Sequence, residues 1–254
     1  LIMNMIDSKW IYGVDNKPLS KVRLFCLPYA GCGSSMYISW KKYFPEEVEL
    51  CPIQLPGREN RRKEDLCCNL RLLVDEMAEG IASFLDKPFG IFGYSMGGVI
   101  AYELALKIKE KYKRSPFVIF MGASTVFMDL DNVSGMKENE LKKYLNFIGG
   151  AELSELNNPS FQEEFFPVIR NDYRMIESYH FNFTPAPCRI CSFASKEDCA
   201  VPFQNISLLK FLTDEFSLIT MRGSHFFIRD DEREITKTVL MHLRKGAFLD
   251  GISI

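Results

Sequence analysis

The sequence predicts an α/β domain in which a mostly parallel central sheet is flanked by helices. Short apolar runs alternate along the chain with amphipathic helical stretches, which is the pattern of parallel strands joined by helices. A glycine-rich turn, GYSMGG (93–98), directly joins one apolar run to a helical stretch. The chain has 254 residues, 47% of them apolar, and no Pro/Ser-rich linker or repeat, so we expect a single domain over residues 1–254.

The expected strands are short apolar runs bounded by turn residues. They occupy residues 21–28, 48–55, 88–93, 116–124, 187–195 and 216–221. The helices are expected from apolar residues that recur every three or four positions. One spans about 66–85, one begins at the turn 93–98 and runs through residue 108, and a closing helix covers about 231–244.

Between the fourth and fifth expected strands the alternation stops. Residues from about 129 to 183 contain helical patterns, such as ENELKKYLNFI and SFQEEFFPVIRNDYRMIESYHF, without a convincing strand. Insertions of this kind often cover an active site, so we expect a helical lid. A helical cap with a purely structural packing role is the alternative.

Composition and charge exclude several classes of protein. A net charge of -2 gives no general attraction for nucleic acid or anionic lipid. No apolar run approaches the length of a membrane span, and the first ten residues have neither a basic lead nor a small-residue cleavage site. The eight cysteines lie mostly in apolar, strand-like segments. We therefore expect a cytoplasmic protein with reduced cysteines.

The segment Gly93-Tyr94-Ser95-Met96-Gly97 matches G-x-S-x-G between an expected strand and an expected helix. This is the setting of a nucleophile elbow, a turn so tight that the positions two before and two after the serine leave little room for a Cβ. No G-K-[ST] follows, which disfavours a phosphate-binding loop. The sequence therefore predicts that Ser95 is a catalytic nucleophile.

A serine hydroxyl is a weak nucleophile unless a histidine accepts its proton. His225 follows the last expected strand, where a loop at the carboxyl edge of the sheet would carry it towards Ser95. We therefore expect His225 to be the base. The remaining histidines, His180 and His242, are expected to be surface or packing residues.

The base in turn needs a carboxylate that holds its tautomer. Asp198 follows the penultimate expected strand and completes the chain order Ser, Asp, His that α/β-hydrolases share. Asp129 and Asp131, after the strand that follows the elbow, are alternatives, and Glu197 adjoins the favoured position. We expect Asp198 to be the acid.

An acyl-transfer site also needs two N–H donors for the oxyanion. The residue after the nucleophile, Met96, supplies the first. The second is expected from the glycine-containing segment LPYAGCGSS (27–35), where Ala30 is the favoured donor and Tyr29 the alternative.

Five segments, LFCLPYAGCGSS, PIQLPGREN, DKPFGIFGYSMGG, IRNDYRMIESY and GSHFF, occur in this order over nearly the whole chain. Together they resemble the type II thioesterases that accompany modular polyketide and nonribosomal peptide synthases. The resemblance implies an α/β-hydrolase fold with a helical lid. It also implies hydrolysis of acyl groups from the phosphopantetheine thiol of carrier proteins. By the same resemblance the triad falls on Ser95, Asp198 and His225, and the oxyanion donors on Ala30 and Met96. It implies a monomer and neither a metal nor a redox cofactor.

The chain departs from the pattern of that family at several positions. Tyr94 stands where the family commonly has histidine, and Cys32 and Ser224 replace glycines. Ser195 and Lys196 replace the usual glycine and aspartate ahead of the acid. We expect Tyr94 to point away from the triad and to be tolerated.

A basic cluster follows the second expected strand and consists of Arg58, Arg61, Arg62 and Lys63. The family resemblance implies a carrier protein with an acidic face, which this cluster could steer towards the site. Interspersed acidic residues favour a solvated run of charges instead.

Two further functions fit the same sequence. The first is a medium-chain fatty acyl thioesterase or a small-molecule esterase on the same fold. The second is a catalytically silent subunit that binds carrier proteins.

Overall fold

The computed structural model describes residues 8–13, 17–127 and 132–247. Within these residues the strands form one six-stranded sheet of order β2-β1-β3-β4-β5-β6, in which every neighbouring pair is parallel. The mostly parallel sheet that the sequence predicts is therefore confirmed. The strands are β1 (Val22–Leu27), β2 (Val48–Pro52), β3 (Phe89–Tyr94), β4 (Val118–Gly122), β5 (Arg189–Ser195) and β6 (Phe216–Met221).

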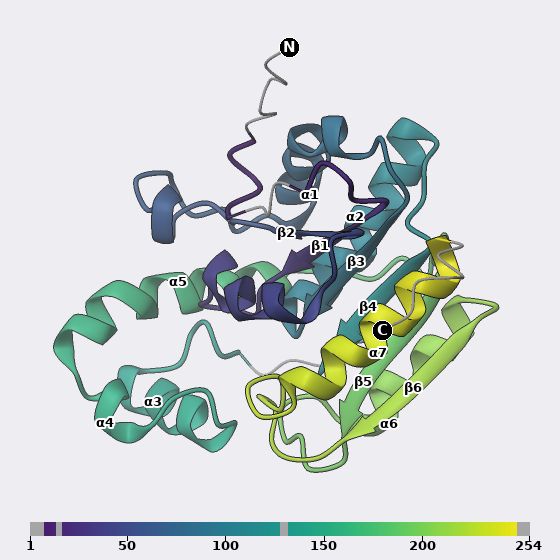
Figure 1. The fold of residues 1–254 in the computed structure, drawn as a ribbon. Coiled ribbons are helices and arrows are strands. Elements are labelled where there is room, and N and C mark those ends of the chain that lie inside the picture. Colours follow the sequence, from purple (N-terminus) through teal and green to yellow (C-terminus); the bar gives the residue numbers. More distant parts are fainter. Residues whose placement is uncertain (1–7, 14–16, 128–131, 248–254) are drawn as a thin grey trace.

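Helices cover both faces of the sheet (Figure 1). The α-helices outside the β4–β5 connection are α1 (Leu70–Gly80), α2 (Met96–Tyr112), α6 (Phe203–Ser207) and α7 (Glu232–Ala247). Shorter 3-10 segments are η1 (Ser34–Tyr43), η2 (Glu59–Arg61), η3 (Ala82–Phe84) and η4 (Leu208–Leu212). The helix expected over 66–85 is shorter than predicted. The side chain of Asn69 accepts a hydrogen bond from the Leu72 N–H (3.0 Å) and so caps α1 at its first turn.

Alternate residues of each strand point to opposite faces, and both faces are buried. On one face, Phe25 and Ile91 pack in the apolar cluster that includes the inner sides of α1 and α2. On the other, Leu24 and Phe92 pack with Trp40 of η1 and with α7. The sheet is thus the middle layer of three. Polar side chains at the ends of its strands can reach a cavity.

The connection between β4 and β5 is helical, with α3 (Glu138–Phe147), α4 (Leu153–Leu156) and α5 (Pro159–Glu177). We call residues 132–188 the helical insertion. It projects from the carboxyl ends of the strands, drawn in green in Figure 1. The first residues of the expected lid, 129–131, lie outside the described residues. Among the helices that are described, none is long and apolar enough to cross a membrane.

Candidate active site

Ser95 lies in the turn between β3 and α2 with φ of 52° and ψ of -120°, a conformation that non-glycine residues rarely adopt. The flanking glycines explain how the turn is possible. A Cβ on Gly93 would collide with the carbonyl of Gly97, and one on Gly97 would collide with the carbonyl of Leu27. The Ser95 N–H donates to the carbonyl of Gly122 at 2.8 Å, which ties the turn to β4.

His225, 130 residues from Ser95 in the chain, lies beside it in the structure. Its Nε2 is 2.9 Å from Ser95 Oγ, and its Nδ1 is 2.8 Å from Asp198 Oδ2. A carboxylate can only accept, so Nδ1 carries the proton and Nε2 is free to accept the hydroxyl proton of Ser95. The structure therefore brings together the three residues that the sequence predicts as a triad, in the geometry that general-base activation of the serine requires.

The carboxylate of Asp198 is completely buried, and its second oxygen is also occupied. Oδ1 accepts hydrogen bonds from the N–H groups of Ala200 (2.8 Å) and Val201 (3.0 Å). These hydrogen bonds fix the orientation of the carboxylate towards His225. The neighbouring Glu197 is exposed and does not contact the histidine. Asp129 and Asp131, which the sequence also allows as the acid, lie outside the described residues.

Both residues expected to supply oxyanion donors line the cavity next to Ser95. Met96 is the first residue of α2, so its N–H has no partner within the helix and lies at the positive end of the helix dipole. Ala30 lines the same cavity, and among the described residues none accepts a hydrogen bond from its N–H. Both predicted oxyanion donors are therefore at the cavity, whereas Tyr29, the second candidate in that segment, does not line it.

The cavity at Ser95 is small. Its volume is about 20 Å³, which is room for about one water molecule. Tyr144, Tyr173 and Ile176 of the helical insertion close it on one side. A second cavity of about 270 Å³ shares Ala30 with it and has aromatic walls that include Phe161 of α5. Ser95 itself is partly exposed, so the insertion narrows the access to it without sealing it.

Three hydroxyl groups outside the predicted triad support the site. Tyr94, expected to take no part, donates to the carbonyl of His225 (2.7 Å) and accepts from the Ile228 N–H (3.3 Å). Burial raises its pKa, so it stays a phenol donor. Ser195 Oγ donates to the carbonyl of Gly223 (2.6 Å) and links the end of β5 to the loop after β6. Ser124 Oγ donates to the Ser95 carbonyl (2.7 Å).

The sequence does not predict these partners, because each bond joins a side chain to a distant backbone group. The sequence marks two of these residues only indirectly, because Tyr94 and Ser195 are departures from the family pattern. In the structure both side chains lie at the ends of strands and donate hydrogen bonds to the loop that carries His225.

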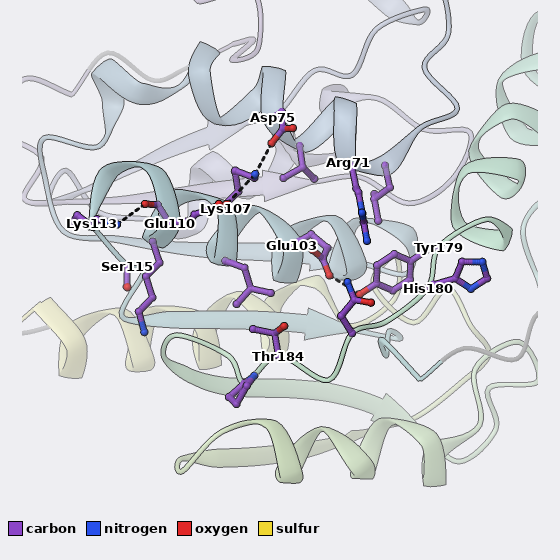
Figure 2. A pocket seen from close by; sticks show the side chains of 16 residues that line it. Arg71, Asp75, Glu103, Lys107, Glu110, Lys113, Ser115, Tyr179, His180 and Thr184 are labelled. Carbon is purple, nitrogen blue, oxygen red and sulfur yellow. Dashed lines mark hydrogen bonds and ion pairs between the residues drawn. The ribbon is translucent and has the colours of Figure 1, made fainter.

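His180 and His242 lie away from Ser95. His180 is exposed and lines a cavity of about 920 Å³ between α1, α2 and residues 179–185 (Figure 2). Among the charged side chains there, Lys107 forms ion pairs with Asp75 and Glu110. His242 lies on α7, 3.7 Å from Cys191 Sγ, and desolvation lowers its pKa. Neither histidine reaches the nucleophile.

The basic cluster after β2 is divided in the structure. Arg58 and Arg61 are buried and form ion pairs with Asp172 and Glu64 respectively, whereas Arg62 and Lys63 are exposed. For Arg58 and Arg61 both sequence interpretations are wrong: they are neither a docking surface nor a solvated run of charges. The short 3-10 turn η2 turns them inward, where the carboxylates compensate their charge.

Comparison with known proteins identifies the family to which this chain is similar. The sequence model of the Thioesterase domain family matches residues 22–245. The gramicidin S biosynthesis protein GrsT of Aneurinibacillus migulanus is 32% identical over 242 residues, 93% of this chain and 94% of the relative. The medium-chain S-acyl fatty acid synthase thioesterase of Homo sapiens is 28% identical over 85% of this chain and 84% of the relative.

A solved structure agrees in fold. The type II thioesterase BorB from the borrelidin biosynthetic cluster superposes with a TM-score of 0.81 at 24% identity, covering 92% of this chain and 98% of that one. The expected α/β-hydrolase fold is confirmed.

Proposed function

This chain belongs to the thioesterase domain family, as the sequence resemblance predicted, and we propose that it is a type II thioesterase of a polyketide or nonribosomal peptide pathway. Its substrate is an acyl group held as a thioester on the phosphopantetheine arm of a carrier protein. The products are the free acid and the carrier thiol, so the enzyme clears carriers that hold an unwanted acyl group.

The first half of the reaction acylates the enzyme. His225 Nε2 takes the proton of Ser95 Oγ, which attacks the thioester carbonyl. The N–H groups of Ala30 and Met96 stabilise the oxyanion, and the carbon–sulfur bond breaks as the imidazolium returns a proton to the leaving thiol. Asp198 holds the imidazole in the required tautomer and stabilises its charged form.

The second half releases the acid. Water gives a proton to His225 and attacks the acyl-enzyme carbonyl, and the proton then passes to Ser95 Oγ as the ester bond breaks. The helical insertion serves as the lid in this proposal, because its tyrosines line the cavity at Ser95 and leave less room there than an acyl chain needs.

The observation that carries the proposal is the continuous hydrogen-bonded series from Ser95 through His225 to Asp198 beside two backbone donors. The likeness to GrsT, whose name places it in gramicidin S biosynthesis, supports the pathway class.

The test compares one acyl group on a phosphopantetheinylated carrier with the same group as an oxygen ester. We expect the thioester to turn over faster, and Ser95→Ala to abolish turnover of both. Preference for the oxygen ester would identify an esterase instead. Turnover that survives Ser95→Ala would remove Ser95 as nucleophile, and absence of turnover in the wild type would support a silent carrier-binding subunit.

The relative from Homo sapiens favours one different substrate, a medium-chain fatty acyl thioester. A panel of acyl lengths on one carrier separates the two proposals. We expect short and medium acyl groups to be released alike, whereas a sharp optimum at medium length would support the fatty acyl thioesterase.

A further inference from the structure

Two of the five family-like segments contain neither a triad residue nor an expected oxyanion donor, yet they meet in the structure. Arg58 of PIQLPGREN and Asp172 of IRNDYRMIESY, 114 residues apart, form a bidentate ion pair with Nη1–Oδ2 of 2.6 Å and Nη2–Oδ1 of 2.7 Å. The side chains are 6% and 1% exposed. The pair joins α5 of the helical insertion to the loop after β2. Burying two charges for structure alone is rarely favourable, so their further contacts are informative.

Both members of the pair also hold the loop that contains Ala30. Asp172 Oδ2 accepts a hydrogen bond from the Gly31 N–H at 2.8 Å. Arg58 Nη1 donates to the carbonyl of Cys32 at 3.2 Å. The ion pair therefore holds two consecutive residues. Asp172 accepts from the N–H of Gly31, and Arg58 donates to the carbonyl of Cys32.

These two residues belong to a tight turn over 29–32. The Cys32 N–H donates to the carbonyl of Tyr29 at 3.1 Å, and Gly31 has φ of +82°, the value that a type II turn requires at its third position. The carbonyl of Tyr29 and the N–H of Ala30 belong to the same planar peptide group. The bond that closes the turn therefore also sets the direction of the Ala30 N–H.

We propose that Arg58 and Asp172 are positioning residues that aim the Ala30 N–H at the oxyanion. They touch no reacting atom and act only through the turn. The inference rests on the proposed function, because it assigns a role within the same reaction. Ile169, one helical turn before Asp172, lies against Gly31 where a Cβ would collide with it, so α5 supports the turn by packing as well.

The test separates positioning from stability. In Asp172→Asn the guanidinium loses its charged partner, whereas Arg58→Met with Asp172→Leu removes both buried charges and replaces them with apolar side chains, a change that folds tolerate well. Glu64→Gln is the matched control, because it breaks the neighbouring pair with buried Arg61, which does not contact the turn. Each variant is assayed with a small acyl thioester and scored for kcat, KM and melting temperature.

We expect kcat to fall about 10- to 100-fold in Asp172→Asn and in the double variant with KM nearly unchanged, somewhat less than the loss of a whole oxyanion donor. Glu64→Gln should keep wild-type kcat. Recovery of kcat in the double variant, or an effect on KM alone, would overturn the inference. If Asp172→Asn does not fold, the double variant decides alone.

A second readout does not depend on the natural substrate. The rate at which a phosphonate fluoride labels Ser95 also depends on the oxyanion donors, because the phosphoryl oxygen occupies their site. We expect this rate to fall with kcat in both variants, and an unchanged rate contradicts the positioning role. If the wild type is labelled in this way but releases nothing from carriers, the proposed function fails while the inference stands.

Discussion

The carboxyl edge of the sheet and the helical insertion meet at one small cavity but are held there differently. At the edge, the Ser95 N–H and the His225 carbonyl are hydrogen-bonded to residues at the ends of β4 and β3, and the Asp198 carboxylate to N–H groups of its own loop. The insertion reaches the cavity through the rings of Tyr144 and Tyr173.

This difference separates two tasks. The chemistry needs atoms fixed to a few tenths of an ångström, which strand ends and hydrogen bonds provide. Admission of the substrate needs side chains that can move. Tyr144 and Tyr173 meet edge to face and share a hydrogen bond of 3.5 Å, which is longer and weaker than the bonds of 2.7 to 3.0 Å that fix the edge. Substitutions at the edge should therefore change the rate of reaction, and substitutions of the rings that line the cavity should change which acyl groups enter. Asp172 is expected to behave like the edge residues although it belongs to the insertion, because it holds the turn that contains Ala30.

The largest effect is expected at the edge. Asp198→Asn keeps the shape of the side chain but no longer favours the tautomer in which Nε2 accepts, so kcat should fall by about 10⁴-fold. Steady-state hydrolysis of a thioester measures this, with Glu197→Gln as the control next to it in the chain. Loss of activity in the control and its retention in Asp198→Asn would exchange their roles.

The insertion is expected to respond in selectivity. Tyr144→Ala removes a half-buried ring from the wall of the 20 Å³ cavity, so kcat/KM for a bulky acyl group should rise about tenfold relative to acetyl. Competition between two acyl thioesters measures the ratio. The same fall in rate for both substrates would mean that Tyr144 positions the chemistry, and the contrast between the two regions would be lost.

A smaller effect on rate is expected at Tyr94, which donates a hydrogen bond to the backbone carbonyl of His225. Tyr94→Phe leaves the His225 carbonyl and the Ile228 N–H without their buried partner, which should lower the free energy of unfolding by about 1–3 kcal/mol. We expect kcat to fall only severalfold, because the imidazole keeps its contact with Asp198. Urea unfolding and kcat are measured together. A loss of kcat as large as that of Asp198→Asn would show that the backbone bond matters as much as the acid.

The smallest effect concerns pH and a pair remote from the cavity. Hydrogen bonds from Arg61 lower the pKa of Glu64 to about 2. Because the pKa is lower in the folded state than the ordinary value of about 4.3, the pair stabilises the fold above that pH, and the contribution is lost as the pH falls towards 2. The carboxylate is 39% exposed, so solvent screening keeps the effect small.

Thermal unfolding of wild type and Glu64→Gln across this acid range measures the contribution. The difference in melting temperature should shrink as the pH falls. A difference that stays constant would mean that the pair contributes through packing.

The sequence could predict features that depend on local patterns or on the order of the strands. The strands and the elbow were predictable because hydrophobic runs and the Gly93 and Gly97 spacing are local patterns. His225 and Asp198 were predictable because strand order brings the ends of parallel strands to one edge.

The bonds that support these residues were not predictable in the same way. Arg58 resembles surface charge in the sequence because nothing near it in the chain indicates a carboxylate 114 residues later. The start of α1 was misplaced because apolar spacing continues through Leu66, while the cap at Asn69 depends on backbone geometry. The size of the cavity at Ser95 depends on how Tyr144 and Tyr173 fill the space beside it, which sequence patterns do not show.

The hydrogen bond from Gly31 to Asp172 bears on how such enzymes can be recombined. A designer who exchanges this insertion for that of another enzyme, in search of new acyl preference, also exchanges the anchor of the segment that includes Ala30. A transfer must then include both α5 and a matching arginine after β2. A chimaera that keeps only one of the two would have the new pocket but lose turnover.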